Sequence, residues 1–257
     1  MLFDTHAHMD HLRFEEDREA LIARIQREGV SLLINPGADM PSSRAALALA
    51  RKYDFIYAAA GVHPHEVKDM KEEDFDELRE MAKDEKVIAI GEIGLDYYYD
   101  HSPRERQREY FIRQLQLAEE LDLPVIIHSR DAAEETYEIL AKYMPSRKAV
   151  LHCFSQSPEM AERYLKLGCF LSFAGPLTFR NAAKLKEAVR LTPMDRLFIE
   201  TDSPYLAPEP FRGKRNDPSK VRQVALEMAR LKGTDLASIA AQTKENACRF
   251  FRIGGEN

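Results

Sequence analysis

Short apolar runs alternate with longer amphipathic stretches along the chain. Eight runs are predicted as β-strands, and several are almost continuously apolar, as expected of parallel strands buried on both faces. The predicted strands are Leu2–His6, Ser31–Asn35, Ile56–Gly61, Val87–Glu92, Val125–His128, Ala149–His152, Cys169–Phe173 and Leu197–Thr201.

Helical patterns fill the intervals between these strands and follow the last of them. Ser102 and Pro103 open one helix, with Glu105 placed to cap it. Asp131 precedes another helix and Glu134 follows three residues later, which is the arrangement of a capping box. Further helices are predicted at about residues 15–28, 42–52, 72–84, 158–167, 180–191, 219–232 and 235–250.

Strands that alternate with helices indicate βαβ units, and eight units predict an α/β protein with a (β/α)8 TIM barrel. A doubly wound sheet alternates in the same way, so the periodicity alone does not decide. The chain holds neither the G-x-G-x-x-G nor the G-x-x-x-x-G-K-[ST] phosphate motif, which disfavours nucleotide-binding folds. Its 257 residues suit one barrel, and we expect residues 1–257 to form a single domain.

Composition changes this picture little. A hydrophobic share of 44% and a charged share of 31% are ordinary for a globular protein. The net charge of −6 attracts no nucleic acid by itself, so such a substrate needs a local basic patch. The three cysteines are spaced too widely for a disulfide framework or a zinc knuckle. With no long apolar run and no visible secretory signal, we expect a cytoplasmic monomer without membrane association.

Residues of the types that bind metals follow the predicted strands where these end. They are His6, His8, His63, His65, Glu92, His128, His152 and Asp202. In a barrel the carboxyl ends of all strands surround one site, so these side chains are expected to converge. Imidazoles with carboxylates suit Zn²⁺ or Mn²⁺ better than a pure Mg²⁺ or Ca²⁺ cage. Because the donors exceed one tetrahedral site, we predict two divalent ions (Mg²⁺, Mn²⁺ or Zn²⁺) about 3.5–4 Å apart.

Two further carboxylates stand near these positions. Asp4 lies two residues before His6 and could hydrogen-bond a ligand histidine, or be a buried polar residue of the barrel. Glu200 competes with Asp202 as a ligand. We prefer Asp202 because its place at the strand end is the more exposed one.

The same residues fall in motifs that resemble those of the TatD-type metal-dependent hydrolases, often called TatD-like deoxyribonucleases, within the amidohydrolase-like barrels. The motifs are DTHAHMD at 4–10, GVHPH at 61–65, GEIGLDYY at 91–98, PVIIHSRDA at 124–132, LHCFS at 151–155, ETDSPYL at 200–206 and RNDP at 215–218. The resemblance covers nearly the whole chain. One departure is Gln156, where the family usually has glycine after HCFS; it removes no ligand.

The resemblance implies a ligand set. It consists of His6, His8 and Asp202 for the first ion, His128 and His152 for the second, and Glu92 as the bridge. Glu92 and Asp202 are then the catalytic residues, with Asp202 orienting the attacking water and accepting its proton. His63 resembles a residue that lines the substrate phosphate rather than a ligand.

Further substrate contacts are predicted from His65, from Arg130 and from Arg215, which lies in a basic loop at residues 211–218. The tyrosines that could stack on a base are Tyr97, Tyr98 and Tyr205. Together these features predict a two-metal deoxyribonuclease, a 3′-5′ exonuclease-like phosphodiesterase that acts preferentially on single-stranded DNA. One alternative is a hydrolase of a small ester, amide or lactone, because such barrels host many chemistries. Another is a binding or quality-control factor that carries metal, which the complete ligand set disfavours.

Overall fold

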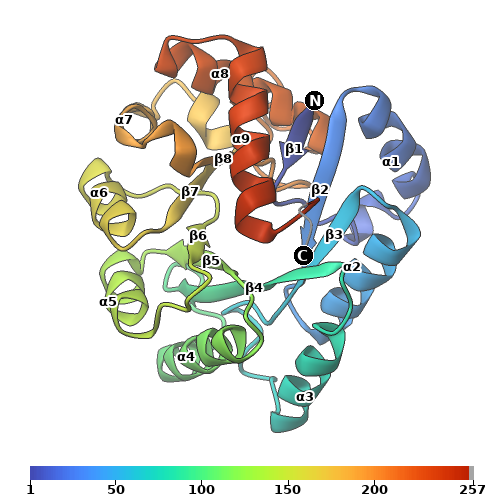
Figure 1. Cartoon of the computed structure of the whole chain (residues 1–257), viewed down its shortest axis with the longest axis vertical. Helices are drawn as coiled ribbons and strands as arrows, with labels where there is room; N and C mark the ends of the chain where they lie inside the picture. The colour runs from blue at the N-terminus through green and yellow to red at the C-terminus, as the bar shows by residue number, and fades with distance from the viewer. Residues whose placement is uncertain (255–257) are drawn as a thin grey trace. The chain divides into compact units, whose positions relative to one another are not determined.

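Eight parallel strands alternate with helices in the computed structural model, which describes residues 1–254 (Figure 1). The strands form one sheet in their sequence order. They are β1 (Leu2–Asp4), β2 (Val30–Pro36), β3 (Ile56–Ala60), β4 (Val87–Asp96), β5 (Val125–Arg130), β6 (Ala149–Leu151), β7 (Phe170–Phe173) and β8 (Leu197–Ile199). The first strand also meets the last, because Thr5 donates its backbone N–H to the Ile199 carbonyl at 3.2 Å. This order and closure confirm the predicted (β/α)8 barrel.

The helices match the predicted intervals. They are α1 (Arg18–Arg27), α2 (Met40–Lys52), α3 (Glu72–Met81), α4 (Arg104–Glu120), α5 (Ala133–Tyr143), α6 (Pro158–Lys166), α7 (Ala183–Leu191), α8 (Val221–Lys232) and α9 (Leu236–Phe251). Short 3-10 helices lie at Leu12–Phe14, Gly175–Thr178, Met194–Arg196 and Pro218–Lys220. Among the described residues, none of these helices combines the length and the apolar character needed to cross a membrane.

The chain divides into two compact units. Unit 1 contains residues 1–35 and 153–166 and the chain from Phe170 onward. Unit 2 contains residues 36–152 and 167–169. The organisation of residues 1–257 as one domain stays a prediction.

In unit 1 the core lies between β7, β8 and the C-terminal helix α9. Phe170 and Phe198 stack with ring centroids 5.1 Å apart, and Phe250 of α9 packs on both rings. Asp235 begins α9 by accepting a hydrogen bond from the Ser238 backbone N–H at 2.7 Å, which satisfies a donor in the first turn. The aromatic contacts fix α9 against the strands and so hold the end of β8 in place.

In unit 2 two buried glutamines fix the loops that follow β3 and β4. Gln114 of α4 bonds both the N–H and the carbonyl of Val62, just before the predicted site residue His63. Gln107 of α4 accepts from the Asp96 N–H at 2.9 Å and donates to the Asp96 carbonyl at 3.2 Å.

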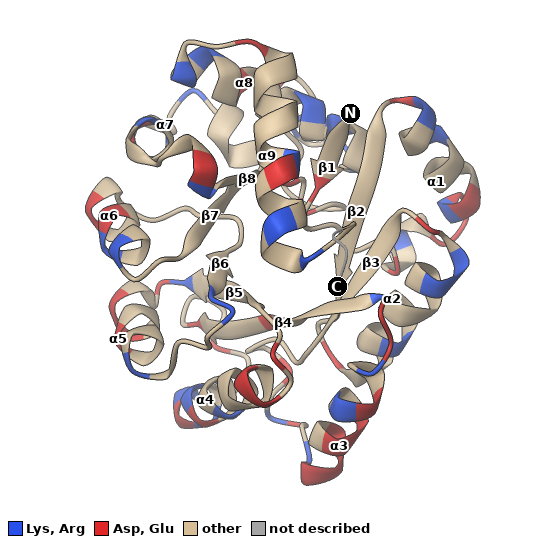
Figure 2. Cartoon of the chain, in the orientation of Figure 1, with Lys and Arg blue, Asp and Glu red and all other residues tan. Residues whose placement is uncertain are grey.

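The charged residues of the chain lie mainly on helices and loops, and few lie on strands (Figure 2).

The structure corrects three details of the sequence analysis. The predicted cap at the start of α4 is wrong, because the N-cap is Pro103 itself and makes no side-chain cap hydrogen bond. The predicted capping box at Asp131 is wrong, because α5 begins one residue later and its N-cap, Ala132, makes no side-chain cap hydrogen bond. Asp131 instead has a left-handed backbone, with φ of 52°. The fourth strand extends to Asp96 instead of ending at Glu92, which places a second carboxylate in the strand.

Candidate metal centre

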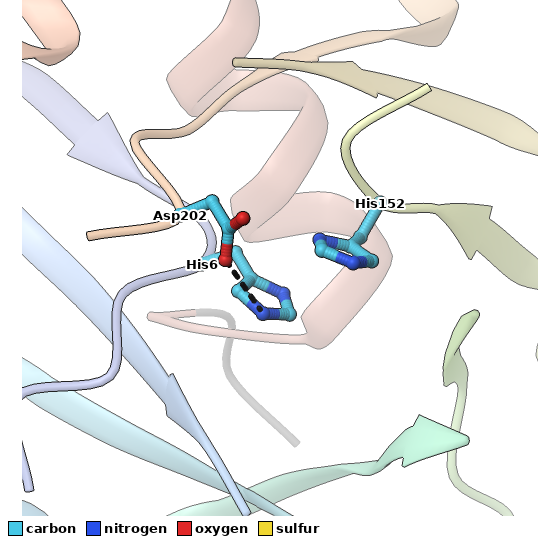
Figure 3. Close-up of side chains that lie close together, drawn as sticks. All are labelled: His6, His152 and Asp202. Atoms are coloured by element: carbon cyan, nitrogen blue, oxygen red, sulfur yellow. Dashed lines mark ion pairs between the residues drawn. The ribbon is translucent and has the colours of Figure 1, made fainter. Parts of the chain in front are cut away.

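In unit 1, His6, His8 and Asp202 bring their side chains together. His6 and His8 follow β1, Asp202 follows β8, and the Nε2 atoms of the two histidines are 3.2 Å apart. Asp202 Oδ1 lies 3.9 Å from His6 Nε2 and 3.6 Å from His8 Nε2, and Figure 3 shows the first of these contacts. His6 is fully buried, whereas the other two are partly exposed. The sequence prediction of these three as neighbours agrees with this geometry.

Hydrogen bonds to the main chain fix the backbone of these three residues of unit 1. Asp202 donates its N–H to the His6 carbonyl at 2.9 Å, and His8 donates to the Ser203 carbonyl at 2.8 Å. Asp4 is buried and accepts from the backbone N–H of both His6 and Thr201. Asp4 therefore supports His6 through its main chain. Burial raises the pKa of the Asp4 carboxyl well above its usual value.

Glu200 has a structural role in unit 1. Its carboxylate is buried and accepts from the Cys153 backbone N–H at 2.6 Å and from the Ser172 hydroxyl at 2.5 Å. These bonds join β7, β8 and the turn at Cys153. The sequence-based choice of Asp202 over Glu200 is consistent with these contacts.

In unit 2, Glu92 lies at the centre of a second cluster. Its Oε1 atom is 2.8 Å from both His128 Nδ1 and His152 Nε2, and 3.5 Å from His63 Nε2. Glu92 projects from the middle of β4 and is almost completely buried. A Cβ at Gly94 would lie 1.9 Å from the His128 carbonyl oxygen, so only glycine permits this close approach of β4 to β5.

Asp96 is a site residue that the sequence analysis missed. Its Oδ2 atom lies 2.9 Å from His128 Nε2 and 3.0 Å from His65 Nε2. Alternate residues of a strand share a face, so Asp96 projects on the same side as Glu92, four residues earlier. That spacing in GEIGLD was the available signal, but it is visible only if the strand is known to reach residue 96.

Two histidines of unit 2 have pKa values shifted in opposite directions, because their surroundings differ. Burial lowers the pKa of His63 to about 3, helped by the neighbouring His128 ring, so His63 is neutral at pH 7. Burial also lowers the pKa of His128, but hydrogen bonds to Asp96 and Glu92 outweigh it and the pKa lies above its usual value. Burial raises the pKa of Asp96, yet hydrogen bonds from His128 and His65 hold it well below its usual range.

Both clusters fit divalent metal ions by their donor types. Unit 1 offers two imidazole nitrogens and a carboxylate, and unit 2 offers two imidazole nitrogens and the Glu92 carboxylate. In unit 2, the ligand atoms of His63, Glu92 and His128 all lie within 4.8 Å of one another. Since Asp96 accepts the Nε2 proton of His128, Nδ1 is the atom that keeps a lone pair for a metal. Nitrogen and oxygen donors of this kind suit Zn²⁺ or Mn²⁺.

The predicted substrate contacts lie in different surroundings. Arg130 is exposed, and its guanidinium lies over the rings of two tyrosines that follow β4. Arg215 forms a two-pronged ion pair with Asp17 in unit 1 and also donates to the Arg13 carbonyl. Its donors are thus engaged within the protein, and a substrate role for Arg215 stays a prediction.

The tyrosines also differ. Tyr97 is half-buried and its hydroxyl donates to Glu135 at 2.5 Å, whereas Tyr98 is exposed. Tyr205 of unit 1 is 41% exposed and lies under the Arg13 guanidinium. Base stacking by any of the three stays a prediction, and Tyr97 is the least exposed of them.

Comparison with known proteins places the chain among metal-dependent hydrolases. The sequence profile of the family described as TatD related DNase matches residues 3–252. The uncharacterized metal-dependent hydrolase YabD of Bacillus subtilis strain 168 is 48% identical over 254 residues, covering 98% of this chain and 100% of YabD. The protein named 3′-5′ ssDNA/RNA exonuclease TatD of Erwinia tasmaniensis is 38% identical, over 98% of this chain and 100% of its own. The crystal structure of YJJV, a TatD homologue from Escherichia coli K12, has a TM-score of 0.93 and 33% identity, covering 98% of each chain.

Proposed function

The chain belongs to the TatD family of metal-dependent hydrolases, and from this premise we propose that it cleaves phosphodiester bonds of single-stranded DNA from the 3′ end. The resemblance noted in the sequence and the assignment to metal-dependent hydrolases are confirmed. The name of the Erwinia relative supports a nucleic-acid substrate. A cytoplasmic monomer remains the prediction for its location and oligomeric state.

The observation that carries the proposal is the pair of clusters with matched donor sets. We propose that one ion binds to His6, His8 and Asp202, and a second to His128 and His152. Glu92 would bind both, as the family resemblance implies. Two such ions, when bound, lower the pKa of a water molecule and stabilise charge that develops on a phosphate. The metal that the protein uses is Mg²⁺, Mn²⁺ or Zn²⁺, and the donor set favours the last two.

The protein's own groups have distinct tasks in this proposal. Asp202 orients the attacking water and accepts its proton, which requires an ionised carboxylate. His63 Nδ1 accepts the backbone N–H of His65 at 3.1 Å, so the proton of the neutral ring sits on Nε2. Because burial keeps His63 neutral at pH 7, it serves as a hydrogen-bond donor to a phosphate oxygen through Nε2 rather than as a general acid.

A nuclease time course tests the proposal. The substrates are 5′-labelled single-stranded and double-stranded oligonucleotides, and the enzyme is stripped of metal and refilled with Mg²⁺, Mn²⁺ or Zn²⁺. We expect a ladder that shortens from the 3′ end, faster on the single strand. Glu92→Gln should lower the rate by about 100- to 1,000-fold or more while circular dichroism shows an unchanged fold.

Two results would argue against a nuclease. The first is a Glu92→Gln variant that keeps the full rate, because the proposed mechanism needs that carboxylate. The second is metal-loaded protein that cleaves no oligonucleotide but turns over small esters, amides or lactones. That outcome would favour the small-substrate hydrolase considered from the sequence.

A further inference from the structure

Two adjacent tyrosines are unusually exposed beside the cluster of unit 2. The residues after β4 include Tyr98, which is 58% exposed, and Tyr99, which is 49% exposed. Their rings meet edge to face with centroids 4.9 Å apart. Large aromatic rings left in water are costly, because each could bury a large apolar area. Exposed rings that are held together beside a reaction site therefore suggest a ligand.

Arg130 completes this surface. Its guanidinium carbon lies 4.1 Å from the Tyr98 ring centroid and 4.7 Å from that of Tyr99, both within cation–π distance. Within residues 1–254, the Arg130 side chain makes no ion pair and no hydrogen bond, in contrast to Arg215. The N–H groups of its guanidinium are consequently available to an anion. We call Tyr98, Tyr99 and Arg130 the tyrosine–arginine surface.

Asp96 ties the tyrosine–arginine surface to the candidate metal ligands. Its Oδ1 atom accepts the backbone N–H groups of Tyr98 at 3.1 Å and Tyr99 at 2.9 Å, while Oδ2 bonds His128. The ring of Tyr99 also lies 5.4 Å from that of His65. One buried carboxylate thus fixes the backbone from which the two tyrosine rings project and, through its other oxygen, a ligand histidine. A molecule lying on the rings would therefore lie beside the candidate metal ligands of unit 2.

We propose that the tyrosine–arginine surface binds single-stranded nucleic acid next to the bond that is cleaved. One or two bases stack on Tyr98 and Tyr99, and Arg130 pairs with a backbone phosphate. Stacking needs exposed base faces and tolerates any base, and arginine recognises phosphate through its planar donors. A duplex hides its base faces, so this surface would favour single strands. The inference rests on the proposed function and specifies where that substrate lies.

The test measures binding directly, so that it does not depend on cleavage. Metal-loaded full-length protein is titrated into a 5′-fluorescein oligothymidylate with phosphorothioate linkages, and fluorescence anisotropy gives Kd at several salt concentrations. The double variant Tyr98→Ala/Tyr99→Ala should raise Kd by about five- to 100-fold. The matched variant Tyr98→Phe/Tyr99→Phe keeps both rings and should bind within about twofold of wild type.

The variant Arg130→Ala tests the contribution of the charge to binding separately from that of the rings. Loss of one phosphate contact should lower the slope of log Kd against log salt concentration by about 0.7. The control is Arg27→Ala, since Arg27 is an exposed arginine on α1 that should leave the slope unchanged. Metal content and thermal midpoint are measured for every variant, so that a folding defect is recognised.

Several outcomes would overturn the proposal. They are an unchanged Kd in the alanine double variant, an equal loss in the phenylalanine variant, and an equal loss of binding to a blunt duplex. If wild-type protein cleaves no oligonucleotide yet binds the single strand through these tyrosines, the surface stands and the nuclease proposal fails. If it cleaves single strands and the tyrosines do not matter, the nuclease stands and the surface fails.

Discussion

The clusters of the two units hold similar donors by different means. In unit 1 the carboxylate oxygen of Asp202 is 3.6 Å and 3.9 Å from its histidines, whereas in unit 2 Glu92 lies 2.8 Å from two of them. The supporting carboxylates differ as well. Asp4 bonds the backbone of His6, whereas Asp96 bonds the imidazole of His128.

The two clusters illustrate two ways in which a protein can position a metal-binding side chain. A main-chain bond fixes where a side chain begins and leaves its ring to be oriented by other contacts. A bond to the ring fixes its rotation and decides which nitrogen carries the proton. Changes to the supporting carboxylate should therefore alter metal affinity more in unit 2 than in unit 1.

The largest expected effect comes from removing a ligand of either unit. His8→Ala and His128→Ala should each lower the bound divalent metal from two ions per chain to one, because each deletes a donor from one cluster. Hydrolysis should fall by about 100-fold or more in both variants. Inductively coupled plasma mass spectrometry of dialysed protein gives the stoichiometry. Two ions retained in either variant would show that the two clusters do not each hold one ion.

A smaller effect is expected from Asp96→Asn. The asparagine amide would donate to His128 Nε2, and the imidazole proton would move to Nδ1, the atom needed for metal. Loss of such a supporting partner should weaken metal affinity by about 10- to 100-fold. Asp4→Asn should instead lower the free energy of unfolding by about 1–3 kcal/mol, because buried hydrogen bonds to Thr201 are weakened.

Competition with a chelating dye measures the affinity, and urea unfolding measures the stability. Asp76→Asn on α3 is the control, since Asp76 is 84% exposed and lies outside both clusters. A loss of metal affinity in Asp4→Asn as large as that in Asp96→Asn would contradict the proposed difference between the two supporting carboxylates.

The smallest expected effect is on pH dependence after metal removal. The pKa of His128 is raised above its ordinary value of 6.5, so the protonated ring stabilises the folded state. This contribution is complete below pH 6.5 and is lost as pH rises through the higher folded pKa. Because His63, with its pKa lowered to about 3, contributes a change of the opposite sign near pH 6.5, the readout is the difference between wild type and Asp96→Asn. Urea unfolding of both chelated proteins should show that the advantage of wild type shrinks as pH rises from about 6 to about 9. An advantage that grows over this interval would contradict the assignment.

Most of the fold could be predicted from the sequence, for a physical reason. Parallel strands buried on both faces must be almost wholly apolar, and helices that cover them must be amphipathic, so both leave a local pattern. The wrong predictions concern local patterns that are compatible with more than one structure. Asp131 and Glu134 have the spacing of a capping box, but the helix begins after Ala132. The end of β4 depends on its pairing with β5, which no local pattern encodes.

The positions of the strands, the family and the residue types at the strand ends could all be predicted from the sequence. The use that the protein makes of those residues became visible only in the folded chain. Glu200 became a structural acceptor, Arg215 became the partner of Asp17, and Asp96 was revealed as the carboxylate that joins His128 to Tyr98 and Tyr99. The residue type alone does not show whether a carboxylate or a guanidinium contacts a ligand, an opposite charge or a backbone group. Its role is set by the groups that folding brings within about 3 Å of it.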